Sequence, residues 1–111
     1  MANIIPFSFR GELFSGTHNF ANGGDSFKIA LYTGNPYSTS STAYLTGQEV
    51  SASNTGYTTG GKVLGSQAVA SGTAVASIDF ADSVLTSATF TAAFAAIYND
   101  SKSDKLCVVL D

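Results

Sequence analysis

The stretch that decides the fold is Thr89–Tyr98, TFTAAFAAIY, followed after six residues by Lys105–Leu110, KLCVVL. The intervening residues Asn99–Asp104, NDSKSD, include no aliphatic side chain. Two apolar runs joined by a polar tip predict a β-hairpin. The second run is apolar on both faces from Leu106 to Leu110, which is typical of a strand that is covered on both sides. The rest of the chain must therefore supply two covers for this hairpin.

Upstream of the hairpin, Phe27–Thr33, FKIALYT, alternates in polarity and predicts a strand. A strand and a turn are predicted over residues 63–74, and another strand over residues 75–80. Serine and threonine are abundant, which favours short strands over long helices. Six to eight short strands with turns at short intervals predict an all-β fold, a small antiparallel β-sandwich or jelly-roll-like barrel.

The first 26 residues are the least regular part of the chain. One short N-terminal helix is predicted over residues 8–15, where Ser8 can act as N-cap, Gly16 can act as stop, and the apolar side comprises Phe7, Phe9, Leu13 and Phe14. The stretch Ile4–Phe7, IIPF, is apolar yet lies at a terminus, where order usually depends on something that holds the chain. We therefore divide the protein into an N-terminal arm, residues 1–9, and a single β-sandwich domain, residues 10–111.

The length and composition of the chain exclude some classes of function. The 111 residues suit one domain, 44% are hydrophobic, and 12% are charged, about half the usual share. Such low charge indicates that part of the surface is meant to meet another surface. The net charge is −3 and the five basic residues are scattered, so we expect no nucleic-acid partner. No signal peptide or membrane-spanning run is recognisable, so we expect assembly in a cytoplasm and no membrane partner.

No set of residues with catalytic, metal-binding or cofactor-binding chemistry can be assembled from the sequence. His18 is the only histidine and is interpreted as an ordinary surface residue, because general-base catalysis and metal binding both need partners. Cys107 is interpreted as a small buried hydrophobe. Two carboxylate pairs lack the alternating pattern of a calcium loop and are interpreted as solvated turn residues: Asp79 with Asp82, and Asp100 with Asp104. We therefore expect no enzyme.

The glycine-rich segment Gly56–Gly61 is interpreted as a tight turn, because Lys62 is followed by Val63 where a phosphate loop needs serine or threonine. The five tyrosines are more informative, since tyrosine is favoured at protein interfaces. Tyr98 is expected to close the core. The tyrosines left as interface candidates are Tyr37, Tyr44 and Tyr57.

Several blocks in this order resemble a family of small structural proteins encoded by tailed bacteriophages. The blocks are FKIALYT at 27–33, GYTTGG at 56–61 and ATFTAAFAAIY at 88–98, with Glu49-Val50 and the DFAD segment at 79–82 between them. Together they cover most of residues 27–110. Two differences stand out: residues 84–86 replace a segment that usually contains tryptophan, and the sequence ends at Asp111 where these proteins generally continue through a further strand.

The resemblance implies a virion structural protein. We expect a capsid decoration or cement protein that resides on the capsid surface and bridges neighbouring subunits of the major capsid protein. The resemblance also implies a homo-oligomer, with a trimer favoured. The expected contacts are the N-terminal arm, which would reach a neighbour, and the loop of residues 35–48; the interface residues that we expect are Ile4, Ile5, Phe7, Phe9, Tyr37, Tyr44 and Tyr57.

Two alternatives remain at this stage. One is a tail-associated or fibre-associated protein that binds a host-surface glycan, in which exposed tyrosines stack on sugars. A concave, open cluster of Tyr37, Tyr44 and Tyr57 would favour glycan binding, and a flat patch continuous with the arm would favour the shell. The other is a cytoplasmic β-domain with an enzymatic role, which ranks last because no acid–base set is present.

Overall fold

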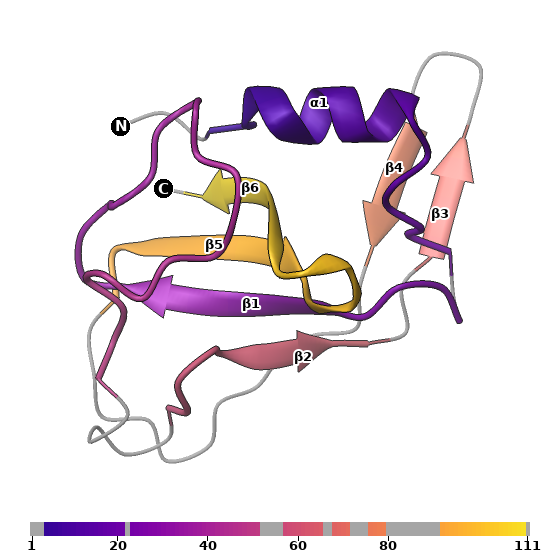
Figure 1. Ribbon diagram of the computed structural model, residues 1–111. Helices are drawn as coiled ribbons and strands as arrows, with labels where there is room; N and C mark the ends of the chain where they lie inside the picture. The colour runs from indigo at the N-terminus through magenta and orange to yellow at the C-terminus, as the bar shows by residue number, and fades with distance from the viewer. Residues whose placement is uncertain are drawn as a thin grey trace.

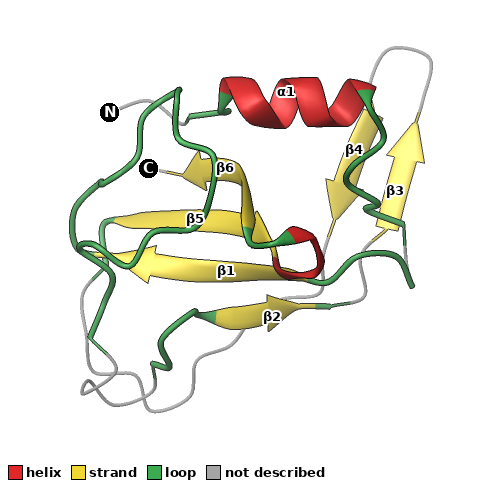
Figure 2. Cartoon of the chain, viewed as in Figure 1, coloured by secondary structure: helices red, strands yellow, loops and turns green. Residues whose placement is uncertain are grey.

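The computed structural model describes residues 4–21, 23–51, 57–65, 68–71, 76–79 and 92–110. These residues form a four-stranded antiparallel sheet, a two-stranded sheet and a short N-terminal helix (Figure 1, Figure 2). The elements are α1 Phe7–Phe14, β1 Phe27–Tyr32, β2 Lys62–Leu64, β3 Ala68–Ser71, β4 Ala76–Asp79, β5 Phe94–Asn99, the 3₁₀-helix η1 Asp100–Lys102 and β6 Lys105–Leu110. The expected mostly β fold with one N-terminal helix is confirmed, but the described residues show no closure into a sandwich or barrel.

The predicted terminal hairpin is present as β5 and β6, and η1 lies at its tip. The four-stranded sheet has the order β2-β1-β5-β6, so the hairpin supplies two of its strands and β1 joins it to β2. The side chain of Asn99 accepts a hydrogen bond of 3.0 Å from the backbone N–H of Ser101 and so caps η1. The strand β5 begins at Phe94; residues 89–91, where the sequence places the start of this strand, lie outside the described residues.

The last strand contains a β-bulge. Ile97 lies opposite Val108, and the next residue of β5, Tyr98, lies opposite Leu106, so Cys107 is an extra residue in β6. Because of the extra residue, Leu106 and Val109 share one face of the sheet while Cys107 contacts the other. Cys107 is 2% exposed, and burial raises the pKa of its thiol to about 12. The interpretation of Cys107 as a small buried hydrophobe is confirmed.

One side of the sheet, here called the tyrosine face, carries the larger core cluster. The cluster comprises Ala30, Tyr32, Tyr37, Ala96, Tyr98, Leu106 and Val109, with Ile4, Tyr44 and Phe94 packed against it. Tyr37 and Tyr44 belong to the loop that follows β1, so the loop itself covers this face. The expectation that Tyr98 closes the core is confirmed, since only 2% of the residue is exposed.

The opposite side, here called the phenylalanine face, is covered by α1 and the segment that follows it. Its core is Phe27, Leu64 and Cys107, with Phe9, Phe20, Ile29 and Ile97 packed against it. The rings of Phe20 and Phe27 stack with centroids 4.3 Å apart and an interplanar angle of 8°. The two covers that the apolar hairpin requires are therefore a loop on one face and a helix on the other.

The outer edge of β6 is paired with segments from the same chain. The backbone N–H of Ile4 donates to the carbonyl of Val109 at 2.9 Å, and the N–H of Val109 donates back at 2.8 Å. Further along the edge, Ala43 pairs with Lys105. Short segments of this kind cover backbone groups that an edge strand would otherwise expose. The boundary expected after residue 9 falls within α1, and residues 1–3 lie outside the described residues.

Candidate functional site

Residues at both ends of the helix α1 determine where it begins and where it ends. Pro6 precedes the first helical residue with extended backbone angles, φ −62° and ψ 149°, which the proline ring favours. Gly16 follows the helix with φ 72°, and the N–H of Thr17 donates to the carbonyl of Glu12 at 3.0 Å. Together with the bond from the N–H of Gly16 to Leu13, these contacts form a Schellman motif. Gly16 is the predicted stop, but the N-cap position is taken by Pro6 and not by Ser8, so the helix begins one residue earlier than predicted.

The inner side of α1 is held mainly by polar contacts. Ser8 donates from Oγ to the carbonyl of Ser41 at 3.3 Å. The carboxylate of Glu12 accepts from His18 and lies 3.6 Å from Nζ of Lys105 on β6. Phe9 is the large apolar residue of α1 that packs onto the phenylalanine face. The spacing 8, 9 and 12 places these side chains on one side of the helix.

The outer side of α1 is apolar and exposed. Phe14 is 95% exposed, Phe7 is 60% exposed and Leu13 is 49% exposed, and Ile5 immediately before the helix is 46% exposed. Arg10 lies one turn after Phe7, with its guanidinium carbon 5.5 Å from the centre of that ring. Phe7, Arg10 and Phe14 share one helix face because they are three and four residues apart. We call this surface the outer ridge: Ile5, Phe7, Arg10, Leu13 and Phe14.

The outer ridge corrects the prediction of one apolar helix side. Of the four residues assigned to that side, Phe9 faces the core, whereas Phe7, Leu13 and Phe14 point to solvent. Isolated exposed apolar residues are common on soluble proteins, but a group of large ones on one short element is a candidate interaction surface. The helix is also well attached beneath, so the ridge is presented in a fixed position.

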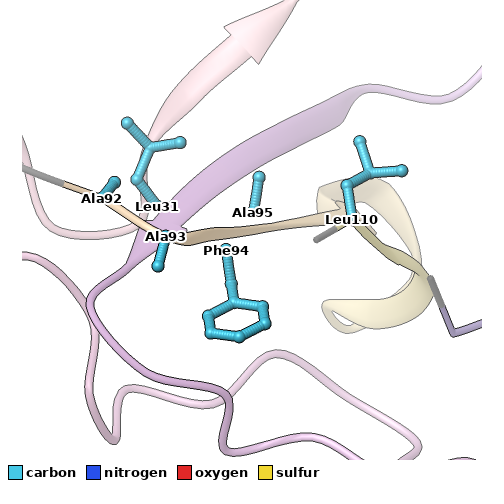
Figure 3. A pocket seen from close by; sticks show the side chains of 6 residues that line it. All are labelled: Leu31, Ala92, Ala93, Phe94, Ala95 and Leu110. Carbon is cyan, nitrogen blue, oxygen red and sulfur yellow. The ribbon is translucent and has the colours of Figure 1, made fainter. Parts of the chain in front are cut away.

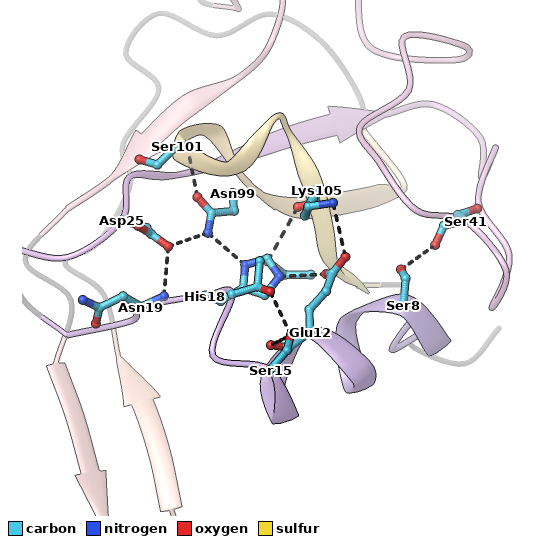
Figure 4. A network of polar contacts seen from close by, with 12 residues as sticks. Ser8, Glu12, Ser15, His18, Asn19, Asp25, Ser41, Asn99, Ser101 and Lys105 are labelled. Atoms are coloured by element: carbon cyan, nitrogen blue, oxygen red, sulfur yellow. Dashed lines mark hydrogen bonds and ion pairs between the residues drawn. The ribbon is translucent and has the colours of Figure 1, made fainter.

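A polar network beneath α1 centres on His18 (Figure 4). The backbone N–H of Ser101 must donate to Oδ1 of Asn99, and Nδ2 of Asn99 donates to Oδ2 of Asp25 at 2.9 Å. The amide orientation of Asn99 is thereby fixed, so Nδ2 also donates to Nδ1 of His18 at 2.8 Å. His18 must then carry its proton on Nε2, which donates to Oε1 of Glu12 at 2.8 Å.

His18 is therefore not the surface residue that the sequence indicates. Its side chain is fully buried, and the rings of Phe9, Phe20 and Phe27 have their centroids 5.1 Å, 6.1 Å and 6.5 Å from the imidazole. It links the helix to β5 through Glu12 and Asn99. Burial opposes ionisation of Asp25, but hydrogen bonds from Asn99 and from the backbone of Asn19, together with the nearby charge of Lys102, lower the pKa of that carboxyl. The network holds α1 on the sheet.

A second polar network, on the tyrosine face, centres on Glu49. The carboxylate accepts hydrogen bonds of 2.5 Å from the hydroxyls of Tyr44 and Tyr57, and one of 2.8 Å from the N–H of Gly60. Tyr98 donates to the carbonyl of Gly60 at 2.5 Å. Burial, followed by the hydrogen bond to Glu49, raises the pKa of both Tyr44 and Tyr57 above the ordinary value. These hydroxyls hold the loops against the sheet.

The tyrosines expected at an interface point inward. Tyr37 and Tyr57 are buried and Tyr44 is partly buried, with its ring stacked on Tyr98 at 4.6 Å. The hydroxyl of Tyr37 meets that of Tyr32 at 2.5 Å and accepts from the N–H of Leu45 at 2.8 Å. These side chains form neither an open concave cluster nor a flat outer patch.

The seven expected interface residues are thus separated. Ile4 packs against the tyrosine face and Phe9 against the phenylalanine face, while Ile5 and Phe7 belong to the outer ridge. The sequence pattern missed Leu13 and Phe14 as surface residues, because an apolar residue in a short helix is normally assigned to the core. The signal that could have found them is the abundance of large apolar residues: a helix of eight residues cannot bury them all on one side.

The described residues contain no group of three or more histidine, cysteine, aspartate or glutamate side chains that could hold a metal ion.

At the hairpin tip, burial and the neighbouring carboxyl of Asp100 raise the pKa of Asp104. Asp100 also lies 4.0 Å from Nζ of Lys28. Within the same described residues, no helix has the length and apolar character needed to span a bilayer.

No family model, curated protein or solved structure matches this chain. The fold and the candidate surface therefore rest on the chain's own residues.

Proposed function

We propose that this protein is a structural protein of a tailed-bacteriophage virion, which decorates the capsid and stabilises it by bridging neighbouring subunits of the major capsid protein. The block order described above, from FKIALYT to ATFTAAFAAIY, supports the assignment to a virion. The proposal places the protein on the capsid surface as a homo-oligomer, with a trimer favoured.

The observation that carries the proposal is the outer ridge of α1. Phe7 and Ile5, two residues expected at an interface, are exposed there beside Leu13 and Phe14. Burying one phenylalanine side chain contributes about 1.5–3 kcal/mol to association. Because Glu12 and Ser8 fix the helix from beneath, little conformational entropy is lost when the ridge binds.

Binding of this kind stabilises a shell by mass action. A ligand that binds only the assembled arrangement of subunits shifts the equilibrium toward assembly. The low charge of the chain suits a contact whose strength depends little on salt. A rigid ridge that lies across two subunits would resist their separation, whereas one that binds a single subunit would not.

We also propose that the complete domain has the expected β-sandwich or jelly-roll-like closure. The pair β3 and β4 supports this proposal, since its register from Ala68 with Asp79 to Ser71 with Ala76 provides strands outside the four-stranded sheet. A second layer of a sandwich requires such strands.

Binding to phage heads that lack the protein tests the function. We expect saturable binding at a stoichiometry that matches the capsid lattice, together with greater resistance of the shell to heat. The variant Phe7→Ser should bind at least about tenfold more weakly, because an exposed aromatic contact is removed. Val63→Thr is the matched control, since Val63 is 53% exposed on β2, away from the ridge.

Three results would contradict the proposal. The first is absence of binding to heads, which would move the assignment to the tail and make a glycan array the next measurement. The second is binding without any gain in heat resistance, which would exclude a cement role. The third is equal loss in Phe7→Ser and Val63→Thr, which would remove the ridge as the contact.

A further inference from the structure

Gly11 lies in the interior of α1, where glycine weakens a helix because it loses more conformational freedom there than any other residue. The helix continues past it, and the N–H of Ser15 donates to the carbonyl of Gly11 at 3.2 Å. The φ of Gly11 is not left-handed, and a Cβ built on it would meet no atom within 4 Å beyond the helix backbone and its chain neighbours. The fold itself therefore gives no reason for a glycine at this position.

Gly11 faces the same side of α1 as the two phenylalanines of the outer ridge. Phe7 and Phe14 are about two turns apart, roughly 10 Å along the helix axis. Gly11 comes four residues after Phe7 and three before Phe14, so it lies between them on the outer side. Both rings are exposed, and neither comes within 4 Å of the Cβ built on Gly11. The ridge therefore has a gap at Gly11, which is bordered by a phenylalanine ring at each end.

Arg10 lies on the opposite flank of the line from Phe7 to Phe14 and gives the ridge its positive charge. It is exposed, and its guanidinium carbon lies 5.5 Å from the centre of the Phe7 ring, so the side chain leans toward the start of the helix. Three lysines lie within 4.0 Å of a carboxylate of the same chain: Lys28, Lys102 and Lys105. In the part of the chain that the structure describes, no carboxylate pairs with Arg10 in this way. Its charge is available to a partner.

Another apolar feature, a recess at the ends of β1 and β6, has neither of these properties (Figure 3). The side chains that line it point to both sides of the sheet, with Phe94 and Ala93 opposite Leu31, Ala95 and Leu110. None of its lining residues is charged. The recess therefore offers a partner neither one continuous surface nor an ionic group, whereas the outer ridge combines exposed rings, a gap and a guanidinium on one helix.

We propose that the outer ridge recognises a segment of the major capsid protein that presents an aliphatic side chain next to a carboxylate. The aliphatic side chain enters the gap over Gly11, between the rings of Phe7 and Phe14. The carboxylate pairs with the guanidinium of Arg10, whose planar fork donates two parallel hydrogen bonds to such a group. This inference rests on the proposed function and deepens it, because it states the chemistry of the surface that the ridge binds.

Each part of this contact favours binding for a separate physical reason. Without a Cβ at Gly11, the partner comes close to the helix backbone, and the rings beside it are removed from water. The Phe7 ring holds the guanidinium of Arg10 by a cation–π contact, so less side-chain entropy is lost on binding. The ion pair also provides specificity, because an apolar surface without a carboxylate would bury the charge of Arg10 unpaired.

The first test fills the gap with Gly11→Leu and measures both thermal unfolding and binding to phage heads that lack the protein. Leucine favours a helix, so we expect the unfolding midpoint to rise by about 3–6 °C. The dissociation constant from heads should rise at least about tenfold, because the added side chain occupies the place of the partner's. A glycine that only the fold requires would give the reverse, a lower midpoint. Gly65→Leu is the matched control, since Gly65 is exposed and a Cβ built there also meets nothing within 4 Å. If Gly11→Leu does not fold, Gly11→Ala replaces it.

The second test reverses the charge of the ridge. Arg10→Glu should bind heads at least about tenfold more weakly, because the partner's carboxylate then meets a like charge. Lys62→Glu makes the same change of charge on β2, away from the ridge, and should bind like the unaltered protein.

The third test locates the carboxylate with Arg10→Lys, which places a primary amine at this position. A carbodiimide added to the decorated heads activates carboxylates, and an amine in contact with one displaces the activating group as a urea and forms an amide. Mass spectrometry should then find a cross-link from position 10 to an aspartate or glutamate of the major capsid protein.

The outcomes separate this inference from the proposed function. If the unaltered protein binds and stabilises heads while Gly11→Leu or Arg10→Glu binds equally well, the inference is overturned and the proposed function stands. The inference is also overturned if either control variant loses as much binding, or if position 10 forms no cross-link to the major capsid protein. Absence of binding by the unaltered protein overturns both.

Discussion

The two covers of the sheet use their polar and apolar groups in opposite ways. On the tyrosine face, the loop cover turns its tyrosines inward, and the carboxylate of Glu49 accepts hydrogen bonds from the hydroxyls of Tyr44 and Tyr57. On the phenylalanine face, α1 turns a carboxylate inward and the ring of Phe14 outward. The first arrangement holds the loops against the sheet. The second also presents an apolar surface to solvent, so the helical cover is where a partner is expected.

The largest expected effect lies beside the loop cover, at Gly61, which directly precedes β2 and lies against the backbone of β1. Gly61 has φ 85°, and an added Cβ would meet the backbone carbonyl oxygen of Ile29. The atoms in the way belong to the backbone of β1, so they cannot move aside as a flexible side chain could. Gly61→Ala should therefore lower the free energy of unfolding by more than about 3 kcal/mol. Denaturant unfolding measures the loss. Gly65→Ala is the control, since a Cβ there meets nothing within 4 Å and its φ is ordinary; a similar loss in both variants would contradict the expectation.

The second comparison removes one residue from each side of the same helix. Phe9→Ala should lower the free energy of unfolding by about 3 kcal/mol, because Phe9 packs against the phenylalanine face. Phe14→Ala should change it by less than about 0.5 kcal/mol, because that ring is exposed. Denaturant unfolding of dilute protein gives both values. A large loss from Phe14→Ala in the monomer would show that the outer ridge serves the fold.

The polar hubs of the two covers are compared by Glu49→Ala and Asn99→Ala. Removing Glu49 leaves two tyrosine hydroxyls and the N–H of Gly60 without their acceptor, so stability should fall by about 2–3 kcal/mol. Removing Asn99 should cost about 2 kcal/mol and should also release Nδ1 of His18. Thermal unfolding gives the losses, and nitrogen chemical shifts of His18 report the tautomer. A proton on Nδ1 in the unaltered protein would contradict the arrangement derived from Asn99.

The sequence predicts the local elements of this fold better than it predicts the contacts between distant segments. Local patterns predicted the hairpin of β5 and β6, the strand β1, the stop at Gly16 and the burial of Cys107, because alternation, turn composition and glycine act over a few residues. The polar network around His18 joins Glu12, Asp25 and Asn99, and Asn99 is 81 residues from the histidine. Nothing local distinguishes such a histidine from a solvated one. Long-range pairing also decides which side of α1 faces the sheet.

The candidate surface shows the same limit. A short helix that contains Phe7, Phe9, Leu13 and Phe14 is read as apolar on one side, since burial is the usual fate of such residues. The choice of Phe9 for the core depends on Phe20 and Phe27, which supply aromatic neighbours. For the tyrosines the error has the opposite sign: Tyr37, Tyr44 and Tyr57 were expected at the surface but lie inside the protein or partly buried. Their amphipathic side chains suit an interface, but Glu49 accepts from Tyr44 and Tyr57, and the backbone N–H of Leu45 donates to the hydroxyl of Tyr37.

The smallest expected effect concerns the hairpin tip, where the edges of both covers meet β6. Burial and the carboxyl of Asp100 raise the pKa of Asp104 in the folded protein. A carboxyl whose pKa is higher in the folded than in the unfolded state opposes folding above that pKa, and the penalty is relieved as the pH falls. Asp104 has φ 57°, a left-handed conformation that asparagine tolerates well. Asp104→Asn should therefore raise the free energy of unfolding at pH 7 by a few tenths of a kcal/mol, since solvent screens the repulsion.

The gain from Asp104→Asn should vanish near pH 3, where the original carboxyl is protonated in both states. Asp25 titrates with the opposite sign. Its pKa is lowered in the folded protein, so it stabilises the fold above its unfolded pKa and this contribution is lost as the pH falls through the folded one. The unaltered protein and Asp104→Asn both lose the contribution of Asp25, so it cancels in the difference between their free energies of unfolding. Unfolding of the two proteins in parallel from pH 7 to pH 3 isolates the tip, and a gain that persists at pH 3 would assign the effect to the backbone preference of asparagine and not to charge.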